Sequence, residues 1–408
     1  MKIQSVRGMR DIMPEESVIR EEIIAKFKLI TDQSGFKRVT LPVVEPNELF
    51  LRTLGANTDI VEKELFLIDD QDKLALRPEL TAGCVRAYLE NGMVSWSQPV
   101  MISTIGKAFR RERPQKNRFR EFTQLDIEII GDERPSFDFL AIKTALVLFS
   151  SLGLSDLTLS INSIGCQNCR PEFRQKLVSY FQNYQNELCP DCQRRLEKNP
   201  LRILDCKEES CQKIAGKAPK PIENLCSECQ NHQQKLTEYL DQAKIDYQIN
   251  DQLVRGLDYY NRTVFEINQR QDIGRQSSIC GGGRYDYLIE ELGGKRTPAI
   301  GWAVGLDRLT SILKSDSKPT GPEYFIIGAT SNHQYIDSII KKLNRHHKFP
   351  LFIPSADSIG KQLQLASKLG AQSAIIIGDH EAETHLVTIK NLSSGEQREI
   401  KEGAVGSL

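Results

Sequence analysis

The feature that most restricts the fold of this chain is a pair of long strand-like stretches, Ile102–Phe109 and Phe119–Ile130, separated by a short charged loop. The two stretches have the composition of antiparallel neighbours. Elsewhere along the chain, helical patterns come in groups and strands come in pairs. This order predicts an α+β fold built on an antiparallel sheet and disfavours a repeated βαβ unit.

Apolar spacing and turn residues predict the other elements of the first part of the chain. A helix is expected over Pro14–Ile30, because Pro14 suits an early helical position and Gly35 follows as a stop. Further helices are expected over residues 80–92 and 137–150. The other strands are expected at Lys37–Pro42, Leu65–Ile68, Leu74–Leu76, Leu157–Ile161, Tyr247–Ile249 and Thr263–Ile267.

A chain of 408 residues is too long for one ordinary core, so two or three domains are expected. The stretch Ser315–Pro322 is typical of a linker and divides a first domain, residues 1–320, from a second, residues 322–408. Residues 165–240 differ in composition and are interpreted as an insertion within the first domain. The second domain is expected to be a compact α/β unit. Its strands are expected at Tyr324–Gly328, Leu351–Pro354 and Ser373–Gly378, its helices at His333–Leu343 and Gly360–Leu369, and a hairpin at His385–Lys390 with Glu396–Ile400.

The charge and hydropathy of the chain exclude some classes of protein. Lysine and arginine together number 54, as do aspartate and glutamate, which argues against a wholly basic surface but leaves room for a local basic groove. The apolar runs are too short to cross a bilayer. Residues 1–7 lack the apolar stretch of a signal peptide. A cytoplasmic protein without a membrane partner is therefore expected.

The basic loop between the two long strands is the first candidate site. Residues 107–120 hold seven lysines and arginines and one acid. A solvated loop is the simpler interpretation, but it does not explain why arginines flank a strand pair with an aromatic residue among them. Phosphate is bound by fork-shaped donors, and a planar base stacks on a ring or a guanidinium. Arg110, Arg118 and Phe119 together supply both kinds of group.

Two further stretches combine glycine with arginine or tyrosine. In Arg255–Glu266, an arginine and a glycine stand beside Tyr259 and Tyr260 at the start of a strand, although adjacent tyrosines are more often core or interface residues. The glycine run Cys280–Asp286 is followed by Ala299–Gly305, in which alternate residues are small and leave one strand face almost bare. No Walker lysine or Rossmann turn accompanies the run, so it indicates phosphate binding only weakly.

The stretch Arg77–Gly83 has two interpretations. It precedes the helix expected over residues 80–92, and its glutamate and threonine are typical of a capping turn. The same polar groups are also suited to a ligand contact. The residues themselves do not favour either interpretation.

Together these stretches resemble class II aminoacyl-tRNA synthetases, and within that class the histidyl-tRNA synthetases. The resemblance runs from residue 3 to the C-terminus. The segments that carry it are Arg7–Asp11, the surroundings of Pro42 (motif 1), Phe109–Glu112 (motif 2), Gly301–Arg308 (motif 3), and the signatures Arg255–Tyr260 and Gly282–Asp286. It implies a class II catalytic core with an inserted helical, cysteine-rich domain, a C-terminal anticodon-binding domain, and a homodimer.

The resemblance also implies an activity. L-histidine is activated by ATP to histidyl-adenylate, with Mg²⁺ bridging phosphate oxygens, and is then transferred to the 3′ end of tRNA(His). The first step needs no general base, because a carboxylate is already an anionic nucleophile. That requirement suits a chain whose first histidine is His232.

Site residues follow by similarity. Arg110 and Arg255 are the expected catalytic residues, reaching the α-phosphate from two sides. The expected ATP contacts are Arg110, Glu112, Arg118, Phe119 and Arg308. The expected histidine contacts are Glu79, Leu80, Thr81, Arg110, Gln124, Glu128, Arg255, Tyr259, Tyr260 and Tyr285. Among these, the resemblance assigns Glu79, Thr81 and Gln124 to the ammonium group, and Glu128 and Tyr260 to the imidazole.

Ten cysteines in an apparently cytosolic chain should be thiols or metal ligands rather than disulfides. Eight of them form four close pairs, Cys166 with Cys169, Cys189 with Cys192, Cys206 with Cys211, and Cys226 with Cys229. This spacing is typical of one or two tetrahedral zinc sites. Histidyl-tRNA synthetases do not need zinc for their chemistry, so a set of reduced, partly buried thiols is the alternative.

Two other functions are alternatives to that of a synthetase. The regulatory subunit of ATP phosphoribosyltransferase is similar over the core but usually lacks both the Arg255–Tyr260 signature and the anticodon domain, and this chain has both. A zinc-stapled RNA-binding module without activity would leave the combined arginine, glutamate and tyrosine residues unexplained.

Overall fold

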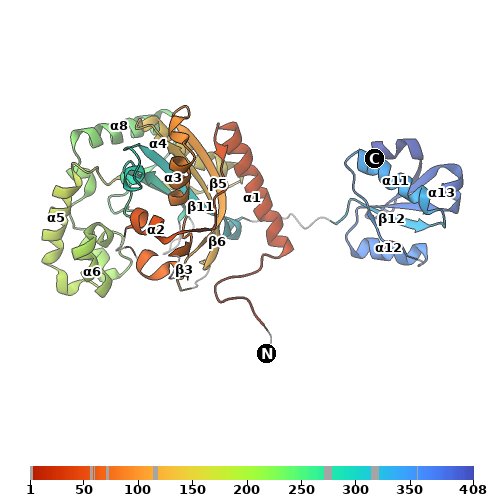
Figure 1. Ribbon diagram of the computed structural model, residues 1–408, viewed down its shortest axis with the longest axis horizontal. Helices are drawn as coiled ribbons and strands as arrows, with labels where there is room; N and C mark the ends of the chain where they lie inside the picture. Colours follow the sequence, from red (N-terminus) through yellow and green to blue (C-terminus); the bar gives the residue numbers. More distant parts are fainter. Residues whose placement is uncertain are drawn as a thin grey trace. The chain divides into compact units, whose positions relative to one another are not determined.

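The computed structural model describes residues 3–55, 58, 60–69, 73–113, 118–270, 278–313, 321–355 and 357–408. The chain divides into two compact units, Met1–Ser315 and Asp316–Leu408 (Figure 1). The predicted linker Ser315–Pro322 lies outside the described residues except for its last two positions. None of the described helices is both long and apolar enough to cross a membrane.

The first unit is built on an eight-stranded sheet with the order β1-β5-β6-β11-β10-β9-β7-β8. Its strands are β1 (Lys37–Arg38), β5 (Val100–Phe109), β6 (Glu121–Ile130), β7 (Leu157–Ser163), β8 (Gln248–Ile249), β9 (Asn261–Gln269), β10 (Ser278–Arg284) and β11 (Ala299–Gly305). Neighbours are antiparallel except at the two edges, where β1 with β5 and β7 with β8 are parallel. The predicted pair of long strands is confirmed as β5 and β6.

One face of this sheet is apolar and is covered by helices. In β6 the odd-numbered residues Leu125, Ile127 and Ile129 are buried in the same core as Trp302 of β11. The helices on this side are α1 (Pro14–Gln33), α4 (Pro135–Ser151), α8 (Ser227–Gln242) and α10 (Leu306–Ile312), and Figure 1 shows α1 along the sheet. Since side chains alternate along a strand, the even-numbered residues of β6 face the opposite side.

The opposite face carries smaller elements and the insertion. A second sheet of order β2-β4-β3, formed by β2 (Val44–Pro46), β4 (Leu74–Leu76) and β3 (Phe66–Asp69), lies with α2 (Asn47–Leu54), α3 (Thr81–Glu90) and the short α9 (Leu288–Glu291). The insertion is helical, with α5 (Arg170–Gln182), α6 (Pro190–Lys198) and α7 (Glu209–Ala215) before α8. Its apolar side chains join the core of α2 and α3.

In the first unit one predicted strand was too long, and β2 and β10 were not predicted. The strand expected over Lys37–Pro42 ends at Arg38, because the carbonyls of Leu41 and Pro42 accept hydrogen bonds from Arg77 Nη1, both at 2.8 Å, instead of from a strand. The glycine run was not predicted as a strand, yet it forms β10, paired on both sides. Glycine disfavours strands in general, and here two neighbouring strands supply the stability.

The second unit has a five-stranded sheet of order β13-β12-β14-β15-β16. The strands are β12 (Tyr324–Ala329), β13 (Leu351–Phe352), β14 (Ser373–Gly378), β15 (Leu386–Asn391) and β16 (Gln397–Lys401). Helix α11 (His333–Arg345) packs on one face and α12 (Ile359–Lys368) on the other, so the predicted α/β unit is confirmed. The predicted hairpin is the antiparallel pair β15–β16, while the short helix α13 (Asp379–Thr384) was not predicted.

Candidate active site

A cavity of about 450 Å³ opens on the polar face of the large sheet. This size is typical of a small-molecule site. Gln124, a predicted histidine contact, lines it. So do all six residues predicted to bind ATP or catalyse the reaction, which are Arg110, Glu112, Arg118, Phe119, Arg255 and Arg308. The strand pair β5–β6, the loop before β9, and the strands β10 and β11 therefore bring these residues together from distant parts of the chain.

Two glycines leave room for charged side chains at or beside the cavity. A Cβ at Gly281 would lie 2.0 Å from Arg255 Nη2, and one at Gly301 would lie 1.7 Å from Glu128 Oε2. Both separations are far below van der Waals contact. Gly301 belongs to the bare strand face predicted from the alternation of small residues, and it leaves room for Glu128. Gly281, in the neighbouring glycine run, leaves room for Arg255.

Arg255 is held at one end of the cavity. Its Nη1 donates to Glu266 Oε1 at 2.9 Å, and its guanidinium lies 5.7 Å from the centre of the Tyr260 ring. Burial by itself lowers the pKa of Arg255, but the charges of Tyr260 and Glu266 outweigh burial and raise it. Arg255 is therefore a fixed cation, with 19% of its side chain exposed toward the cavity.

Arg110 lies across the cavity at the end of β5. Its Nε donates to the carbonyl of Pro78 at 3.0 Å, and its guanidinium lies 5.3 Å from the ring centre of Phe122. These contacts use one donor and leave the terminal guanidinium nitrogens available to a ligand. Arg110 and Arg255 thus line one cavity from two different elements.

The outer part of the cavity contains the other predicted ATP contacts. Arg118 pairs with Glu112 at 3.0 Å. The guanidinium of Arg10 lies 4.5 Å from the ring centre of Phe119 and covers one of its faces. The other face of Phe119 is the one available for stacking.

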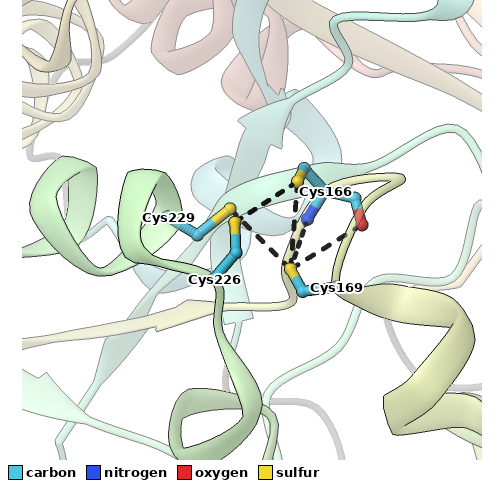
Figure 2. A group of neighbouring side chains, drawn as sticks. All are labelled: Cys166, Cys169, Cys226 and Cys229. Carbon is cyan, nitrogen blue, oxygen red and sulfur yellow. Dashed lines mark hydrogen bonds between the residues drawn. The ribbon is translucent and has the colours of Figure 1, made fainter.

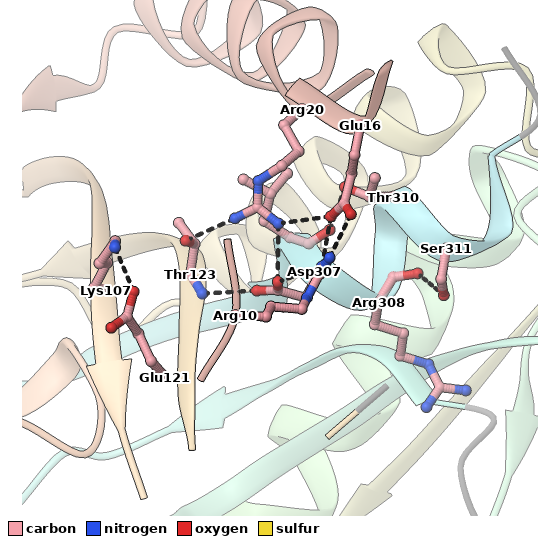
Figure 3. A network of polar contacts seen from close by, with 11 residues as sticks. Arg10, Glu16, Arg20, Lys107, Glu121, Thr123, Asp307, Arg308, Thr310 and Ser311 are labelled. Carbon is pink, nitrogen blue, oxygen red and sulfur yellow. Dashed lines mark hydrogen bonds and ion pairs between the residues drawn. The ribbon is translucent and has the colours of Figure 1, made fainter. Parts of the chain in front are cut away.

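Arg308 is oriented by the residue before it. Asp307 accepts hydrogen bonds from Arg20 Nη1 and from the backbone N–H of Thr123, both at 2.9 Å, and from Arg10 at 3.3 Å. Figure 3 shows this network on one side of α10, with the Arg308 side chain extending away from it. The network fixes the start of α10, so Arg308 extends into the cavity.

A buried set of acids and tyrosines adjoins the cavity. The Tyr285 hydroxyl donates to Glu128 Oε2, and the ring centres of Tyr259 and Tyr285 are 5.7 Å apart. Burial raises the pKa of Glu128 to about 8, although hydrogen bonds from Tyr285 and Thr81 lower it in part. Tyr260 lies against Tyr259, with ring centres 4.5 Å apart.

The stretch Arg77–Gly83 forms the capping turn that was one of its two interpretations. Glu79 accepts hydrogen bonds from the backbone N–H groups of Thr81 at 2.8 Å and Ala82 at 2.7 Å, at the start of α3. Burial raises the pKa of Glu79, and these hydrogen bonds oppose the rise. The predicted contact Leu80 has its side chain in the apolar core, so only its backbone is available to a ligand.

The signature Gly282–Asp286 contributes mainly to the stability of the core rather than to the cavity lining. Arg284 is fully buried, and its Nε and Nη1 each donate at 2.8 Å to Asp138 and Asp286 respectively. Asp138 also lies 2.6 Å from His232 Nε2, which makes the first histidine of the chain part of the core. Buried charges of this kind are stable only when paired, and this network supports β9 and β10 beneath the cavity.

Charged side chains near the cavity that were not predicted include Asp126, Asp205, Lys207 and Glu266. Asp126 lies between Gln124 and Glu128 on the same strand face, fully buried, and neither of its oxygens has a hydrogen-bond partner among the described residues. Burial raises its pKa well above the usual range. Its alternation with Gln124 and Glu128 was the signal that could have identified it. The others, Asp205, Lys207 and Glu266, line the cavity from the insertion and from β9, and their sequence gives no comparable signal.

The eight paired cysteines meet in two groups of four. Cys166, Cys169, Cys226 and Cys229 form one group, which Figure 2 shows, and Cys189, Cys192, Cys206 and Cys211 form the other. Within each group the sulfur atoms all lie within 4.8 Å of one another. All eight are free thiols in the structure.

Comparisons with known proteins agree with this geometry. The family model described as histidyl-tRNA synthetase matches residues 8–168 and 196–309, and that of an anticodon-binding domain matches residues 322–407. The histidine–tRNA ligase of Acetivibrio thermocellus is 42% identical over 98% of this chain and 97% of its own length. That of Aquifex aeolicus is 41% identical over 98% and 99%. A crystal structure of apo S. aureus histidyl-tRNA synthetase is similar over 100% of this chain and 99% of its own, with a TM-score of 0.82 and 30% identity.

The fold and the arginine-lined cavity on its sheet are those of a class II aminoacyl-tRNA synthetase. Within that class, the chain belongs to the histidyl-tRNA synthetase family.

Proposed function

We propose that this chain is an enzyme that activates L-histidine with ATP and transfers the histidyl group to the 3′ end of tRNA(His), releasing pyrophosphate and AMP. The observation that carries the proposal is the shared cavity of Arg110 and Arg255, beside the buried pair of Glu128 and Tyr285. Fixed cations beside a buried acid are suited to a triphosphate and an imidazole amino acid at once.

In the first step, a carboxylate oxygen of histidine forms a bond to the α-phosphorus of ATP, and the bond to pyrophosphate breaks. No proton has to be removed from the nucleophile. Arg110 and Arg255 neutralise charge on the α-phosphate and the carboxylate, while Arg118 and Arg308 bind the outer phosphates and Phe119 stacks on adenine. The residues act by positioning and electrostatic stabilisation.

Recognition of histidine is assigned to the buried polar set. Glu79, Thr81 and Gln124 bind the ammonium group, with a contribution from the Leu80 backbone. Glu128 and Tyr260 bind the imidazole nitrogens, and Tyr259 and Tyr285 line the pocket. An amino acid without a ring N–H leaves the buried Glu128 without its partner, which disfavours it strongly.

Glu112 is the residue suited to Mg²⁺. Its carboxylate lies at the cavity with Arg118 beside it, and hard oxygen ligands of this kind combine with phosphate oxygens around Mg²⁺. The ion supplies charge neutralisation on the outer phosphates when bound.

Three further properties belong to the proposal. The second unit binds the anticodon, although residues 322–408 carry nine basic and nine acidic side chains and have no strong basic surface. The chain forms a homodimer through the region around Pro42, where Val43 and Val44 are 40% and 41% exposed. The enzyme acts in the cytoplasm.

The test is histidine-dependent exchange of pyrophosphate into ATP. We expect exchange in the wild-type chain, and we expect Arg255→Ala to reduce it by at least about 100-fold, the usual cost of removing a transition-state donor. Absence of exchange in the folded wild-type chain would overturn the proposal and favour a regulatory subunit. No observation in this structure favours that second function.

A further inference from the structure

We infer that the insertion is a two-zinc module: the two groups of four cysteines each bind one Zn²⁺ through four thiolates. We name the group Cys166, Cys169, Cys226 and Cys229 the base site, and the group Cys189, Cys192, Cys206 and Cys211 the wall site.

The sulfur spacing is the first argument. Zn–S bonds measure about 2.3 Å, so a regular tetrahedron of four sulfurs around zinc has edges of about 3.8 Å. In the base site the sulfur of Cys166 lies 3.9 Å from that of Cys169 and 3.7 Å from that of Cys226. The Cys169–Cys229 distance is 3.9 Å. A disulfide needs about 2.05 Å between sulfurs, so these are separations of ligands rather than of bonded pairs.

The wall site has the same spacing. The sulfurs of Cys189 and Cys206 are 3.9 Å apart, and all four sulfurs lie within 4.8 Å of one another. Its ligands are Cys189 just before α6, Cys192 in α6, Cys206 between α6 and α7, and Cys211 in α7. Two independent sites on one module thus share one geometry, which argues against chance proximity of thiols.

Backbone groups around the sulfurs are the second argument. The N–H of Cys166 points at Cys169 Sγ and the N–H of Cys189 at Cys211 Sγ, both at 3.2 Å. The N–H of Glu208 lies 3.5 Å from Cys206 Sγ. Four thiolates around Zn²⁺ carry a net negative charge, and such N–H donors stabilise it.

Gly165 makes the base site possible. It has φ +75°, and a Cβ there would lie 2.7 Å from Cys169 Sγ. The turn before Cys166 therefore needs both the left-handed backbone and the missing side chain of glycine.

The base site joins the two ends of the insertion. Cys166 and Cys169 directly follow β7, and Cys226 and Cys229 lie at the start of α8, which packs on α4 of the catalytic core. Residues 170–225 form the loop that the metal closes. Closing a long loop through a metal restricts the unfolded chain, so metal binding contributes folding free energy.

The wall site connects the insertion to the catalytic cavity. Cys206 stands between Asp205 and Lys207, and both line the cavity. Helix α6 begins beside Cys189 and is followed by Asn199, whose side-chain amide donates to Asp258 of the Arg255–Tyr260 signature. A metal at the wall site therefore positions residues of the active-site wall.

Three of the eight cysteines lie outside the segments that match the family model. The match to the histidyl-tRNA synthetase family leaves out residues 169–195, a range that contains Cys169, Cys189 and Cys192.

Metal analysis of the full-length chain is the direct test, and it needs no substrate. We expect about two zinc ions per chain after purification in zinc-containing medium and desalting, and zinc X-ray absorption with four sulfur ligands at about 2.3 Å. Less than half a zinc per chain after reconstitution with excess Zn²⁺, or a shell dominated by nitrogen and oxygen, overturns the proposal. This result does not depend on whether exchange activity is found.

Single variants separate the sites. Cys226→Ser and Cys206→Ser are each expected to lose about one zinc, and Cys84→Ala, a cysteine outside both groups, is expected to lose none. We expect Cys226→Ser, at the base site, to lower the Tm of the chain. We expect Cys206→Ser, at the wall site, to raise the substrate KM values in the exchange assay about 10-fold or more. If a variant does not fold, replacing zinc by Co²⁺ in the wild-type chain supplies the same information, because tetrahedral thiolate coordination gives Co²⁺ a distinctive visible spectrum. If neither variant loses zinc, the assignment is overturned.

Discussion

Arg255 and Glu266 approach each other across the end of the cavity, with Nη1 and Oε1 at 2.9 Å. One residue comes from the loop before β9 and the other from β9 itself. The carboxylate fixes the direction of the guanidinium without covering it, because Arg255 also lines the cavity.

Removing this carboxylate is expected to reduce catalysis through Arg255. In Glu266→Ala the guanidinium loses its orienting partner, and we expect kcat for exchange to fall about 10-fold to 100-fold. Glu266→Gln retains a hydrogen-bond acceptor and should lose less. Steady-state exchange kinetics make the comparison. Equal losses in the two variants would contradict an orienting role.

Gly281→Ala is expected to displace the Arg255 guanidinium without unfolding the chain. The new Cβ would meet Arg255 Nη2 at 2.0 Å, and the end of a flexible side chain moves more easily than a sheet. We expect exchange to fall at least about 10-fold with Tm almost unchanged. Gly360→Ala is the control, since nothing lies within 4 Å of a Cβ there. A large fall in Tm for Gly281→Ala would mean that the sheet, not the arginine, gives way.

The stability of the chain should depend on pH through Glu128. Burial raises its pKa from 4.5 to about 8, so the folded state binds a proton that the unfolded state has already released. Stability from this group is complete below pH 4.5 and is lost as pH rises to about 8. Glu79 and Asp126 shift in the same direction. We expect Tm to fall between pH 5 and 8, and Glu128→Gln to reduce that slope, measured by calorimetry. An unchanged slope would be inconsistent with a buried acid at this position.

Asp307→Asn is expected to weaken ATP binding more than histidine binding. The substitution removes the charge that holds Arg10 and Arg20, so the start of α10 and the orientation of Arg308 change. We expect KM for ATP to rise about 10-fold and stability to fall by about 1–3 kcal/mol. Lys107→Ala breaks a pair whose lysine is 59% exposed and serves as the control, with little effect expected. Equal rises in both KM values would argue against a role specific to Arg308.

Much of the fold could be predicted from apolar patterns because most apolar side chains of its strands are buried in a core. The strands Leu74–Leu76 and Ser373–Gly378 were predicted with the bounds that the structure has. Prediction failed where a tertiary contact replaced the local pattern. Arg77 takes the carbonyls that would have extended β1, and two neighbouring strands hold the glycine run of β10 extended.

The residues of the candidate site could be predicted from their chemical types, but the contacts between them could not. Arginines and tyrosines have recognisable chemistry in a sequence, but nothing local to Arg255 indicates Glu266 as its partner. Asp126 was missed although its alternation with Glu128 was visible. The pairing of the cysteine pairs also required the structure, since the first joins the fourth and the second joins the third across the insertion.

The glycines of β10 and β11 have a consequence for how such an enzyme can change its substrate. A side chain larger than glycine at Gly281 would meet Arg255, and one at Gly301 would meet Glu128. A new preference has to come from the sides, through Glu128, Tyr260 or residues of the insertion. Evolution of a new substrate preference would therefore keep Gly281 and Gly301 and change residues at the sides of the cavity.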